Sequence, residues 1–318
     1  MTSWLVTGGT GLIGRHLIHS LSSNDSVAVL TRQSKISLAR EVKIITADLS
    51  FQTIPALPQV DRVVHCATLH HAQKLTTKEI QLLHDTNVNG LKRLLESLAS
   101  APPRRFYLMS SVKVSELEST LNCDGVEWIF SKTKQQSEQI SIDWALKNGV
   151  ELVILRPAPV YGPEVKENLG KFFHGVSSGK FLFVGSGQQK KSMVFIENLV
   201  AAIRFLDTVS IDRINGPVTV SDYNHYSLRQ VADWIADVAA VPRPKCLGSD
   251  SPARLVANCV LKVRAFSPLP RSLLSLNAWL TESIHEPTLL KYLGFTPPFD
   301  TNEAINLTVK STQRGAHA

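Results

Sequence analysis

A glycine-rich turn near the start of the chain constrains the fold more than any other feature. The apolar run "SWLVT" (residues 3–7) leads directly into "TGGTGLIG" (7–14), and a helical pattern of apolar residues follows. Glycines spaced by three residues at a strand–helix junction permit a tight turn, and they let the backbone approach a pyrophosphate at the helix N-terminus. We therefore predict dinucleotide contacts from Gly8, Thr10, Gly11, Leu12, Ile13 and Gly14.

The rest of the first half alternates apolar strands with helical patterns. Apolar, β-branched runs of strand length lie at 26–31, 42–47 and 61–67, and further strands are predicted at 104–111 and 151–157. Helical patterns occupy residues 86–100 and 132–148. Strands that are apolar on both faces and alternate with helices are typical of a parallel sheet covered on both sides. The predicted fold class is therefore α/β, with a Rossmann-like doubly wound parallel sheet.

The alternation loosens after Pro157, and the later segments are mostly helical, for example residues 227–240. From this change we predict a dinucleotide-binding Rossmann domain over residues 1–165, to which residues 190–222 partly return. Residues 166–318 then form a smaller, mostly helical lobe that binds the substrate.

The charge of the chain bears on its partners. A formal net charge of +7 raises nucleic acid as a partner. The basic residues are dispersed, however, and form no stripe interleaved with aromatic residues. We predict no nucleic-acid partner. A basic pocket for an anionic small molecule and a generally basic surface both account for the charge.

Neither membrane insertion nor a metal site is predicted. The first residues lack the basic and apolar regions of a signal peptide, and no run of about 18 apolar residues is present, so we expect a cytoplasmic protein. The pair His70–His71 is more typical of a polar loop than of a metal site, because adjacent side chains point in different directions. The widely spaced cysteines indicate reduced thiols: Cys66, Cys123, Cys246 and Cys259.

The end of the second predicted strand bears on the choice of cofactor. Sites selective for NAD usually carry an acidic residue there, which accepts a hydrogen bond from the ribose 2′-hydroxyl. This chain has Thr31 and Arg32 instead, with Lys35 nearby, and a guanidinium suits a 2′-phosphate. We therefore predict NADP as the preferred cofactor, with NAD as the other choice. The competing interpretation is that Arg32 is simply a solvated residue at the sheet edge.

Further motifs occur in an order that resembles one family. They are "ADLS" (47–50), "VVHCAT" (63–68), "NVNG" (87–90), "SSVKV" (110–114), "SK" (131–132) and "LRPAPVYGP" (155–163). With the glycine turn, they resemble the extended short-chain dehydrogenases/reductases, the NAD-dependent epimerase/dehydratase family of nucleotide-sugar enzymes. "SSVKV" and "KKSMVFIENLVAAI" (190–203) resemble more specifically the bacterial 4-ketosugar reductases and 4-epimerases of surface-polysaccharide synthesis.

The resemblance implies roles for individual residues. Ser111 would hydrogen-bond the substrate oxygen, and Lys132 would hold the nicotinamide ribose and lower the pKa of a catalytic tyrosine four residues before it. Lys191, with Lys190 beside it, would bind the substrate's pyrophosphate. The remaining implied contacts around the cofactor are Asp48, Leu49, Cys66, Ala67, Thr68, Asn87, Arg156 and Pro157.

The position of that tyrosine is occupied by Trp128. An indole N–H donates a hydrogen bond but exchanges no proton near neutral pH, and loss of a general acid–base group typically slows a reaction about a hundred- to ten-thousand-fold. Three alternatives follow. Ser111, Lys132 or water supplies the proton; the chain binds cofactor without catalysis; or the local register differs and another group fills the role. The same helix carries Gln136 where many relatives have a glutamate, which we expect to affect packing only.

The predicted function is that of an NAD(P)-dependent nucleotide-sugar oxidoreductase or epimerase that acts at sugar C4 in surface-glycan synthesis. The alternative is a catalytically impaired dinucleotide-binding protein of the same fold, with a regulatory or partner role. Val112 and Lys113 stand where sugar 4,6-dehydratases carry acidic residues, so that reaction is not expected. The resemblance also implies a homodimer formed through the helices at 86–100 and 132–148.

Overall fold

The computed structural model divides the chain into two compact units. The first comprises residues 1–158, 200–220 and 288–295, and the second comprises residues 159–199, 221–287 and 296–318. Within these units the structure describes residues 2–21, 25–34, 42–51, 53–70, 76–119, 125–165, 168–247 and 281–315. The predictions made for Lys35, His71, Cys123 and Cys259 lie outside the described residues.

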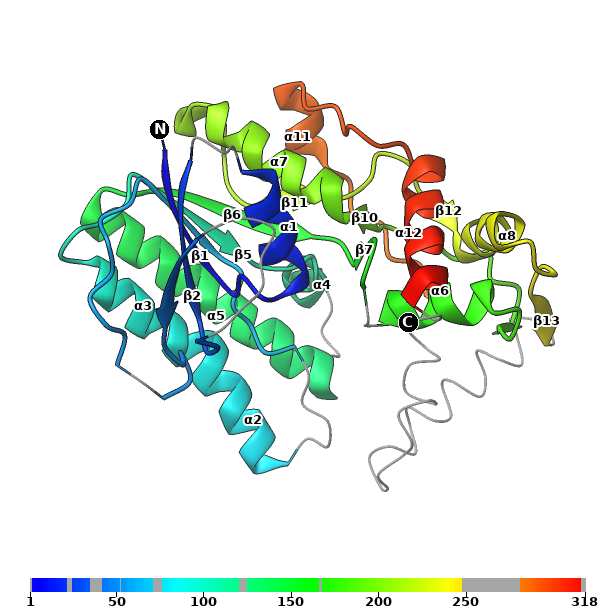
Figure 1. Cartoon of the computed structure of the whole chain (residues 1–318), viewed down its shortest axis with the longest axis horizontal. Coiled ribbons are helices and arrows are strands. Elements are labelled where there is room, and N and C mark those ends of the chain that lie inside the picture. Colours follow the sequence, from blue (N-terminus) through cyan, green and yellow to red (C-terminus); the bar gives the residue numbers. More distant parts are fainter. Residues whose placement is uncertain are drawn as a thin grey trace. The chain divides into compact units, whose positions relative to one another are not determined.

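A seven-stranded sheet forms the centre of the first unit, in the order β11-β6-β5-β4-β1-β2-β3 (Figure 1). Its strands are β1 (Ser3–Thr7), β2 (Ser26–Thr31), β3 (Lys43–Thr46), β4 (Arg62–His65), β5 (Arg105–Met109), β6 (Glu151–Pro157) and β11 (Val218–Val220). Every neighbouring pair is parallel. The strand order changes direction between β1 and β4, the position beside which doubly wound sheets bind ligands. The predicted fold class is confirmed.

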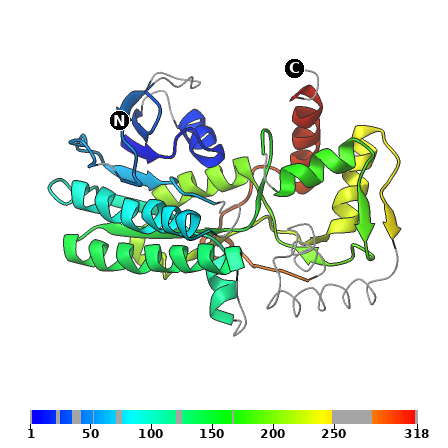
Figure 2. The same cartoon turned by 90° about the horizontal axis from the view of Figure 1, so that it is seen from below.

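Helices cover both faces of this sheet, with α1 and α7 on one face and α3 and α5 on the other (Figures 1 and 2). Their bounds are α1 (Leu12–Ser20), α2 (Thr77–His84), η1 (Asp85–Asn89), α3 (Gly90–Leu98), α4 (Lys113–Ser119), α5 (Gly125–Asn148) and α7 (Ile196–Thr208). Leu91 and Leu94 of α3 pack in one core with Phe106 of β5 and Ala145 of α5. The apolar strands are buried because both faces of the sheet are covered.

Helix α5 is longer than the predicted helix over residues 132–148. It begins at Gly125, seven residues earlier, so Trp128 lies within its first turns. Because each residue of an α-helix turns by about 100° around the axis, residues four apart in this segment, such as Trp128 and Lys132, lie on the same face of α5.

The second unit is mostly helical, with α6 (Asn168–Ser177), α8 (Leu228–Ala239) and α12 (Thr301–Gly315) packed together. Its strands form short pairs: β7 (Val160–Tyr161) with β10 (Val194–Phe195), β9 (Lys190–Lys191) with β12 (Tyr226–Ser227), and β8 (Leu182–Val184) with β13 (Lys245–Leu247). A capping box formed by Ser227 and Gln230 starts α8, which satisfies backbone N–H groups that would otherwise lack partners. Asp222 accepts a hydrogen bond from the buried Tyr161 hydroxyl (2.8 Å).

One segment that the sequence analysis assigned to the smaller lobe belongs to the first unit. Helix α11 (Thr288–Leu293) lies beside β11. The ring of Phe295 then contacts Phe205 of α7, with 5.3 Å between the ring centroids. This packing is a contact between residues far apart in the sequence, which local patterns do not encode.

A buried arginine ties the amino end of β5 to the end of α7. Arg105 is 1% exposed, and its Nε donates to Glu151 Oε2 at 2.7 Å. Its terminal nitrogens donate to the carbonyl oxygens of Leu206 (2.6 Å), Asp207 (3.3 Å) and Val209 (3.0 Å). A buried guanidinium is tolerated only with such a full set of acceptors, so these contacts fix the start of β5.

Arg105→Met tests this arrangement. The change removes the hydrogen bonds that Arg105 donates to three carbonyl oxygens and leaves Glu151 Oε2 without its buried cationic partner, so we expect the free energy of unfolding to fall by about 3–5 kcal/mol. Arg104→Met is the matched control, because the Arg104 side chain is 65% exposed and its contact with Glu151 is 3.5 Å long; an exposed pair contributes at most about 1 kcal/mol. Urea denaturation followed by circular dichroism measures both. Equal losses in the two variants would contradict the role given to Arg105.

Candidate functional site

The glycine turn joins β1 to α1 and leaves little room for side chains. Gly8 has a φ of +69°, and a Cβ at this position would lie 2.7 Å from the Ala67 nitrogen. A Cβ on Gly14 would lie 2.4 Å from the Gly8 carbonyl oxygen. The Gly11 N–H donates to that oxygen (2.9 Å), and Gly11 caps a helix without acidic residues in its first turn. Bare backbone and the positive end of a helix therefore meet here, as a bound pyrophosphate requires.

The end of β2 lies next to this turn, because the Gly8 N–H donates to the Leu30 carbonyl oxygen (3.3 Å). Thr31 is buried, and its hydroxyl accepts a hydrogen bond from the Gln33 N–H (3.3 Å). Arg32 is exposed. The guanidinium is therefore accessible to a ligand beside the turn.

The predicted cofactor contacts after β3 and β4 lie at the same edge of the sheet: Asp48, Leu49, Cys66, Ala67 and Thr68. The Ala67 N–H donates to Thr7 Oγ1 (3.2 Å), which holds the loop after β4 against β1. Asp48 Oδ1 accepts from the Ser50 N–H (2.8 Å). Burial raises the pKa of the Cys66 thiol to about 12, so Cys66 is a neutral, unreactive thiol near neutral pH.

Asn87 of η1 connects the loop after β4 to helix α5. Its side-chain nitrogen donates to the Leu69 carbonyl oxygen (3.0 Å) and to Thr133 Oγ1 (3.2 Å). Its side-chain oxygen accepts from the Leu69 N–H (2.7 Å) and the Thr68 hydroxyl (3.1 Å). All four hydrogen-bonding positions of the amide are used, so Asn87 holds both segments in place.

A buried ion pair stands where β5 and β6 end. Arg156 binds both carboxylate oxygens of Glu138, from Nε to Oε1 at 3.0 Å and from Nη2 to Oε2 at 2.7 Å. The Ser110 hydroxyl also donates to Glu138, and Arg156 Nη1 donates to Ser115 Oγ at 3.0 Å. A bidentate pair has a narrow range of geometries, so it fixes α5 against the end of the sheet.

Ser111 follows β5 directly and opens the loop to α4. Its Oγ accepts a hydrogen bond from the Lys113 N–H (3.2 Å), and the residue is half-buried. The neighbouring Val112 N–H donates to the Pro157 carbonyl oxygen (3.2 Å). Ser111 and Pro157 therefore lie at the carboxyl ends of adjacent strands.

Trp128 and Lys132 contact each other on α5. Trp128 is 37% exposed, and Lys132 Nζ lies 5.8 Å from the centroid of its ring. Lys132 Nζ also donates to Gln135 Oε1 (3.1 Å). These contacts join residues of α5 itself.

Phe130 and Lys134 follow Trp128 and Lys132 by two positions in the sequence, and both are buried. The Phe130 ring lies 4.5 Å from the His70 ring, measured between centroids. Lys134 is 5% exposed, and its Nζ donates to the Met109 carbonyl oxygen at the end of β5 (2.8 Å). Burial lowers the pKa of Lys134 to about 8. The structure therefore places the ammonium of Lys134, rather than that of Lys132, against the carboxyl end of the sheet.

Phe130, Lys134 and Glu138 are not among the site residues predicted from the sequence, although their spacing in the sequence contains a signal for them. The glutamate that many relatives have at position 136 is found here two residues later, as Glu138. A lysine also recurs with the same offset, at Lys134 after Lys132. The glutamate and the lysine are both displaced by two residues from the positions that the resemblance gives them. A shift of the whole motif by two residues explains both displacements at once, whereas otherwise two independent substitutions are needed.

Lys190 and Lys191 form β9 in the second unit, separately from the residues above. Their backbone pairs with β12 in antiparallel register, opposite Ser227 and Tyr226. Lys190 is exposed and Lys191 is half-buried. Both are thus held on a short strand rather than in an irregular loop.

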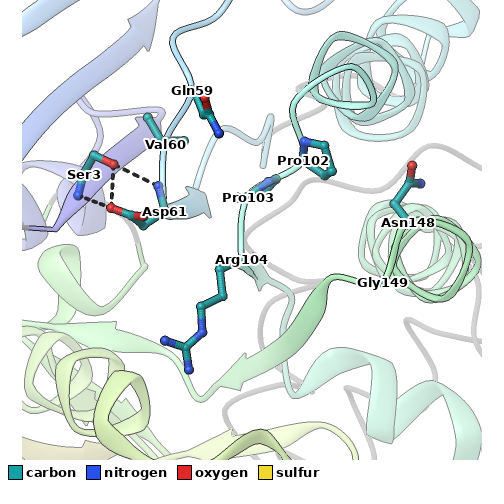
Figure 3. Close-up of a pocket in the computed structure, with 9 residues that line it drawn as sticks. All are labelled: Ser3, Gln59, Val60, Asp61, Pro102, Pro103, Arg104, Asn148 and Gly149. Carbon is teal, nitrogen blue, oxygen red and sulfur yellow. Dashed lines mark hydrogen bonds between the residues drawn. The ribbon is translucent and has the colours of Figure 1, made fainter.

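A hollow in the first unit lies at the opposite ends of the strands (Figure 3). Its walls are Ser3, Gln59, Val60, Asp61, Pro102, Pro103, Arg104, Asn148 and Gly149. Hydrogen bonds from the Ser3 N–H (2.8 Å) and hydroxyl (2.7 Å) to Asp61 Oδ2 hold the pKa of that carboxyl below its usual value. Doubly wound sheets bind ligands at the carboxyl ends of their strands, so this hollow is not the candidate site.

The described residues also provide information on metal binding, membrane-spanning helices and cysteine pairing. They contain no group of three or more His, Cys, Asp or Glu side chains arranged to hold a metal ion. None of the helices within the described ranges has the length and apolar character needed to cross a membrane. Cys66 and Cys246, the cysteines that the structure describes, are free thiols.

Two curated relatives align with about two thirds of the chain. A UDP-glucose 4-epimerase of Vibrio cholerae is 32% identical over 215 residues, which cover 63% of this chain and 65% of the relative. The N-acetyl-alpha-D-glucosaminyl-diphospho-ditrans,octacis-undecaprenol 4-epimerase of Escherichia coli O157:H7 is 25% identical over 207 residues, which cover 63% and 62%. The chain therefore spans less than two thirds of the length of each of these relatives.

Solved structures share the fold over nearly the whole chain. A UDP-N-acetylglucosamine 4-epimerase from Methanobrevibacter ruminantium has a TM-score of 0.75 at 19% identity and covers 99% of both chains. A UDP-glucuronic acid 4-epimerase from Bacillus cereus, solved in complex with NAD, has a TM-score of 0.74 at 16% identity and covers 98% of this chain and 99% of that one.

The model of the NAD dependent epimerase/dehydratase family matches residues 4–212, which is more than half of the chain. That range contains the glycine turn, all but the first residue of the parallel strands β1 to β6, and helix α5. The chain belongs to the NAD dependent epimerase/dehydratase family.

Proposed function

We propose that this protein is an NAD(P)-dependent nucleotide-sugar oxidoreductase or epimerase that acts at sugar C4, in the cytoplasm, in surface-glycan synthesis. The proposal is carried by one observation: the bare glycine turn, Ser111 and a buried ammonium all lie at the carboxyl edge of one parallel sheet. The names of the two curated relatives support a reaction at C4, and the undecaprenol-linked substrate named for the E. coli relative supports glycan synthesis.

The residues at this edge suit a nicotinamide dinucleotide, which when bound exchanges a hydride with the sugar carbon. The turn from Gly8 to Gly14 and the N-terminus of α1 would hold its pyrophosphate. The solved B. cereus neighbour contains NAD. Our preference for NADP rests on the exposed Arg32 after β2, where an acidic residue would be needed to select NAD.

On the substrate side, the hydroxyl of Ser111 would hydrogen-bond the oxygen at C4 and orient it, because this hydroxyl stands where β5 ends. Lys191, with Lys190 beside it, would bind the pyrophosphate of the nucleotide sugar. The net charge of +7 favours such an anionic substrate.

A catalytically impaired dinucleotide-binding protein, with a regulatory or partner role, is the second candidate. One observation favours it: both aromatic residues that stand four positions before a lysine of α5, Trp128 and Phe130, lack a phenolic hydroxyl. Without a phenol, the usual proton donor of this family is missing from the helix.

The two candidates predict different results for one preparation. The purified protein is incubated with NAD+ or NADP+ and either UDP-glucose or UDP-N-acetylglucosamine, because oxidation at C4 needs an oxidised nicotinamide to accept the hydride. In separate reactions it is incubated with NADH or NADPH and a UDP-linked 4-keto sugar. We expect conversion at C4, followed by NMR, and a rate about a hundredfold lower for Ser111→Ala, because a hydrogen bond to the reacting oxygen is lost. Cofactor binding by calorimetry without conversion of any of these sugars would contradict the enzymatic proposal and favour the second candidate.

Arg32→Glu tests the cofactor preference. The change replaces the partner of a 2′-phosphate with a like charge, so we expect NADPH to bind at least about tenfold more weakly, while the affinity for NADH stays within about twofold. Lys43→Glu is the matched control, because it makes the same change in charge at the amino end of β3. Isothermal titration calorimetry measures both cofactors. An equal loss for NADH and NADPH in Arg32→Glu would refute the preference.

We also propose a homodimer that forms through the outer sides of the adjacent helices α3 and α5 (Figure 2). Leu146 of α5 is 80% exposed, and Leu82 of α2 and Trp128 of α5 are also exposed large apolar side chains. Apolar side chains exposed along neighbouring helices are what a helix–helix interface would cover.

Leu146→Glu tests the dimer, because it puts a charge into the apolar interface. Size-exclusion chromatography with light scattering should show a dimer for the unchanged protein and a shift toward the monomer for Leu146→Glu. Leu182→Glu, at a 51% exposed leucine of β8 in the second unit, should remain dimeric. A monomeric unchanged protein would rule the dimer out.

A further inference from the structure

Helix α5 offers two pairs of an aromatic residue and a lysine four positions later: Trp128 with Lys132, and Phe130 with Lys134. Positions two residues apart in an α-helix point about 200° away from each other. Both pairs therefore cannot face the same edge of the sheet, and the structure distinguishes them by their surroundings.

The surroundings of Lys134 are those of a ligand-facing cation. Its Nζ lies 5.7 Å from the centroid of the Phe130 ring and donates to the carbonyl oxygen of Met109, the last residue of β5. Within the described part of the chain, the bond to Met109 is the one hydrogen bond that Lys134 Nζ donates. An ammonium has three N–H donors. Two donors of a buried ammonium thus remain for a ligand at the carboxyl end of the sheet, where an unfilled donor is costly.

Hydrogen bonds on both sides of Lys134 along α5 keep its side chain directed toward the end of β5. One residue before it, Thr133 accepts a hydrogen bond from Asn87 (3.2 Å). One turn after it, Glu138 is bound by both Arg156 and Ser110. The side of α5 that carries Lys134 is therefore fixed against η1, β5 and β6.

We propose that Phe130, Lys134 and Glu138 occupy the positions that the resemblance gave to Trp128, Lys132 and Gln136, and that Lys134 holds the transferable proton of the site at Nζ. This inference rests on the proposed function and names the group that replaces the missing phenol. In the direction of reduction, a bound reduced nicotinamide would supply the hydride for the new C–H bond at the carbonyl carbon. The carbonyl π electrons form the O–H bond with the proton of Lys134, and nitrogen keeps the electron pair of the broken N–H bond. Water then reprotonates the amine.

Among Lys134 and its charged and titratable neighbours, Lys134 is the group whose protonation changes near neutral pH. Burial and the Lys134 charge lower the pKa of His65 to about 3, and burial raises that of Cys66 to about 12. Glu138 is paired with Arg156. The pKa of Lys134 is lowered to about 8. Because the ammonium is the donor, the rate of carbonyl reduction should fall as the pH rises through about 8.

Two matched pairs of variants test the assignment in the whole 318-residue chain. Lys134→Met and Lys132→Met are compared for their affinity for NADH by calorimetry, after circular dichroism has shown that both fold. We expect about tenfold or weaker binding for Lys134→Met, which loses a charged donor, and a change within about twofold for Lys132→Met. The opposite pattern is expected if Lys132 is the lysine of the site, and it would overturn the assignment.

The second pair, Phe130→Tyr and Trp128→Tyr, adds a phenol and preserves the lysines. A phenol at position 130 would lie near Lys134 Nζ and the end of β5, so turnover of Phe130→Tyr should rise about tenfold or more. Trp128→Tyr should not gain activity. Gained activity for Trp128→Tyr alone would sink the proposal. The expected binding pattern without turnover in any variant would uphold the assignment and refute the proposed function instead.

Discussion

The arrangement of the candidate site depends on the buried ion pair between Arg156 and Glu138. It joins β6 to α5 through two hydrogen bonds, and the hydroxyls of Ser110 and Ser115 fill further positions of the two charged groups. A buried ion pair is stable only while its geometry is good and its other hydrogen bonds are made. Rotation or sliding of α5 would leave a buried charge without its partner, so the pair determines which side chains of the helix face the sheet.

Other contacts of α5 agree with this orientation. Thr133 and Ser137, which are one turn apart, both bond to Asn87 of η1, through its side chain and its carbonyl oxygen respectively. Lys134 bonds to the end of β5. The residues at 133, 134, 137 and 138 are all buried, and such spacing places them on one face of a helix. Independent bonds to η1, β5 and β6 therefore specify a single rotation of α5.

Much of the fold could be predicted from the sequence, because its signals are local. The glycine turn and the β-branched strands predicted the parallel sheet, and β1, β2 and β6 have the predicted bounds. The return of residues 288–295 to the first unit could not be predicted, because it depends on the long-range contact between Phe295 and Phe205.

The orientation of α5 could not be predicted from its own sequence for a related reason. The run "FSKTK" (130–134) contains two lysines, each preceded by a hydroxyl residue, so a short motif fits it in two registers. The aromatic residues do not distinguish the two registers, because Trp128 stands four positions before Lys132 and Phe130 stands four positions before Lys134. The register is decided by Glu138, whose partner Arg156 lies on another element, 18 residues away.

The cost of burying each lysine also indicates that Lys134, and not Lys132, belongs to the candidate site. Lys132 keeps its ammonium near a partly exposed Trp128, an arrangement with little desolvation cost. Lys134 is buried, and among the described residues it forms no ion pair, because the Glu138 carboxylate is bound by Arg156 and Ser110. Burial of a charge without a paired carboxylate lowers stability. Folding therefore gains little from this ammonium, whereas a ligand oxygen beside it would offset its desolvation. A group that destabilises the free protein and is satisfied by a ligand is typical of a functional site.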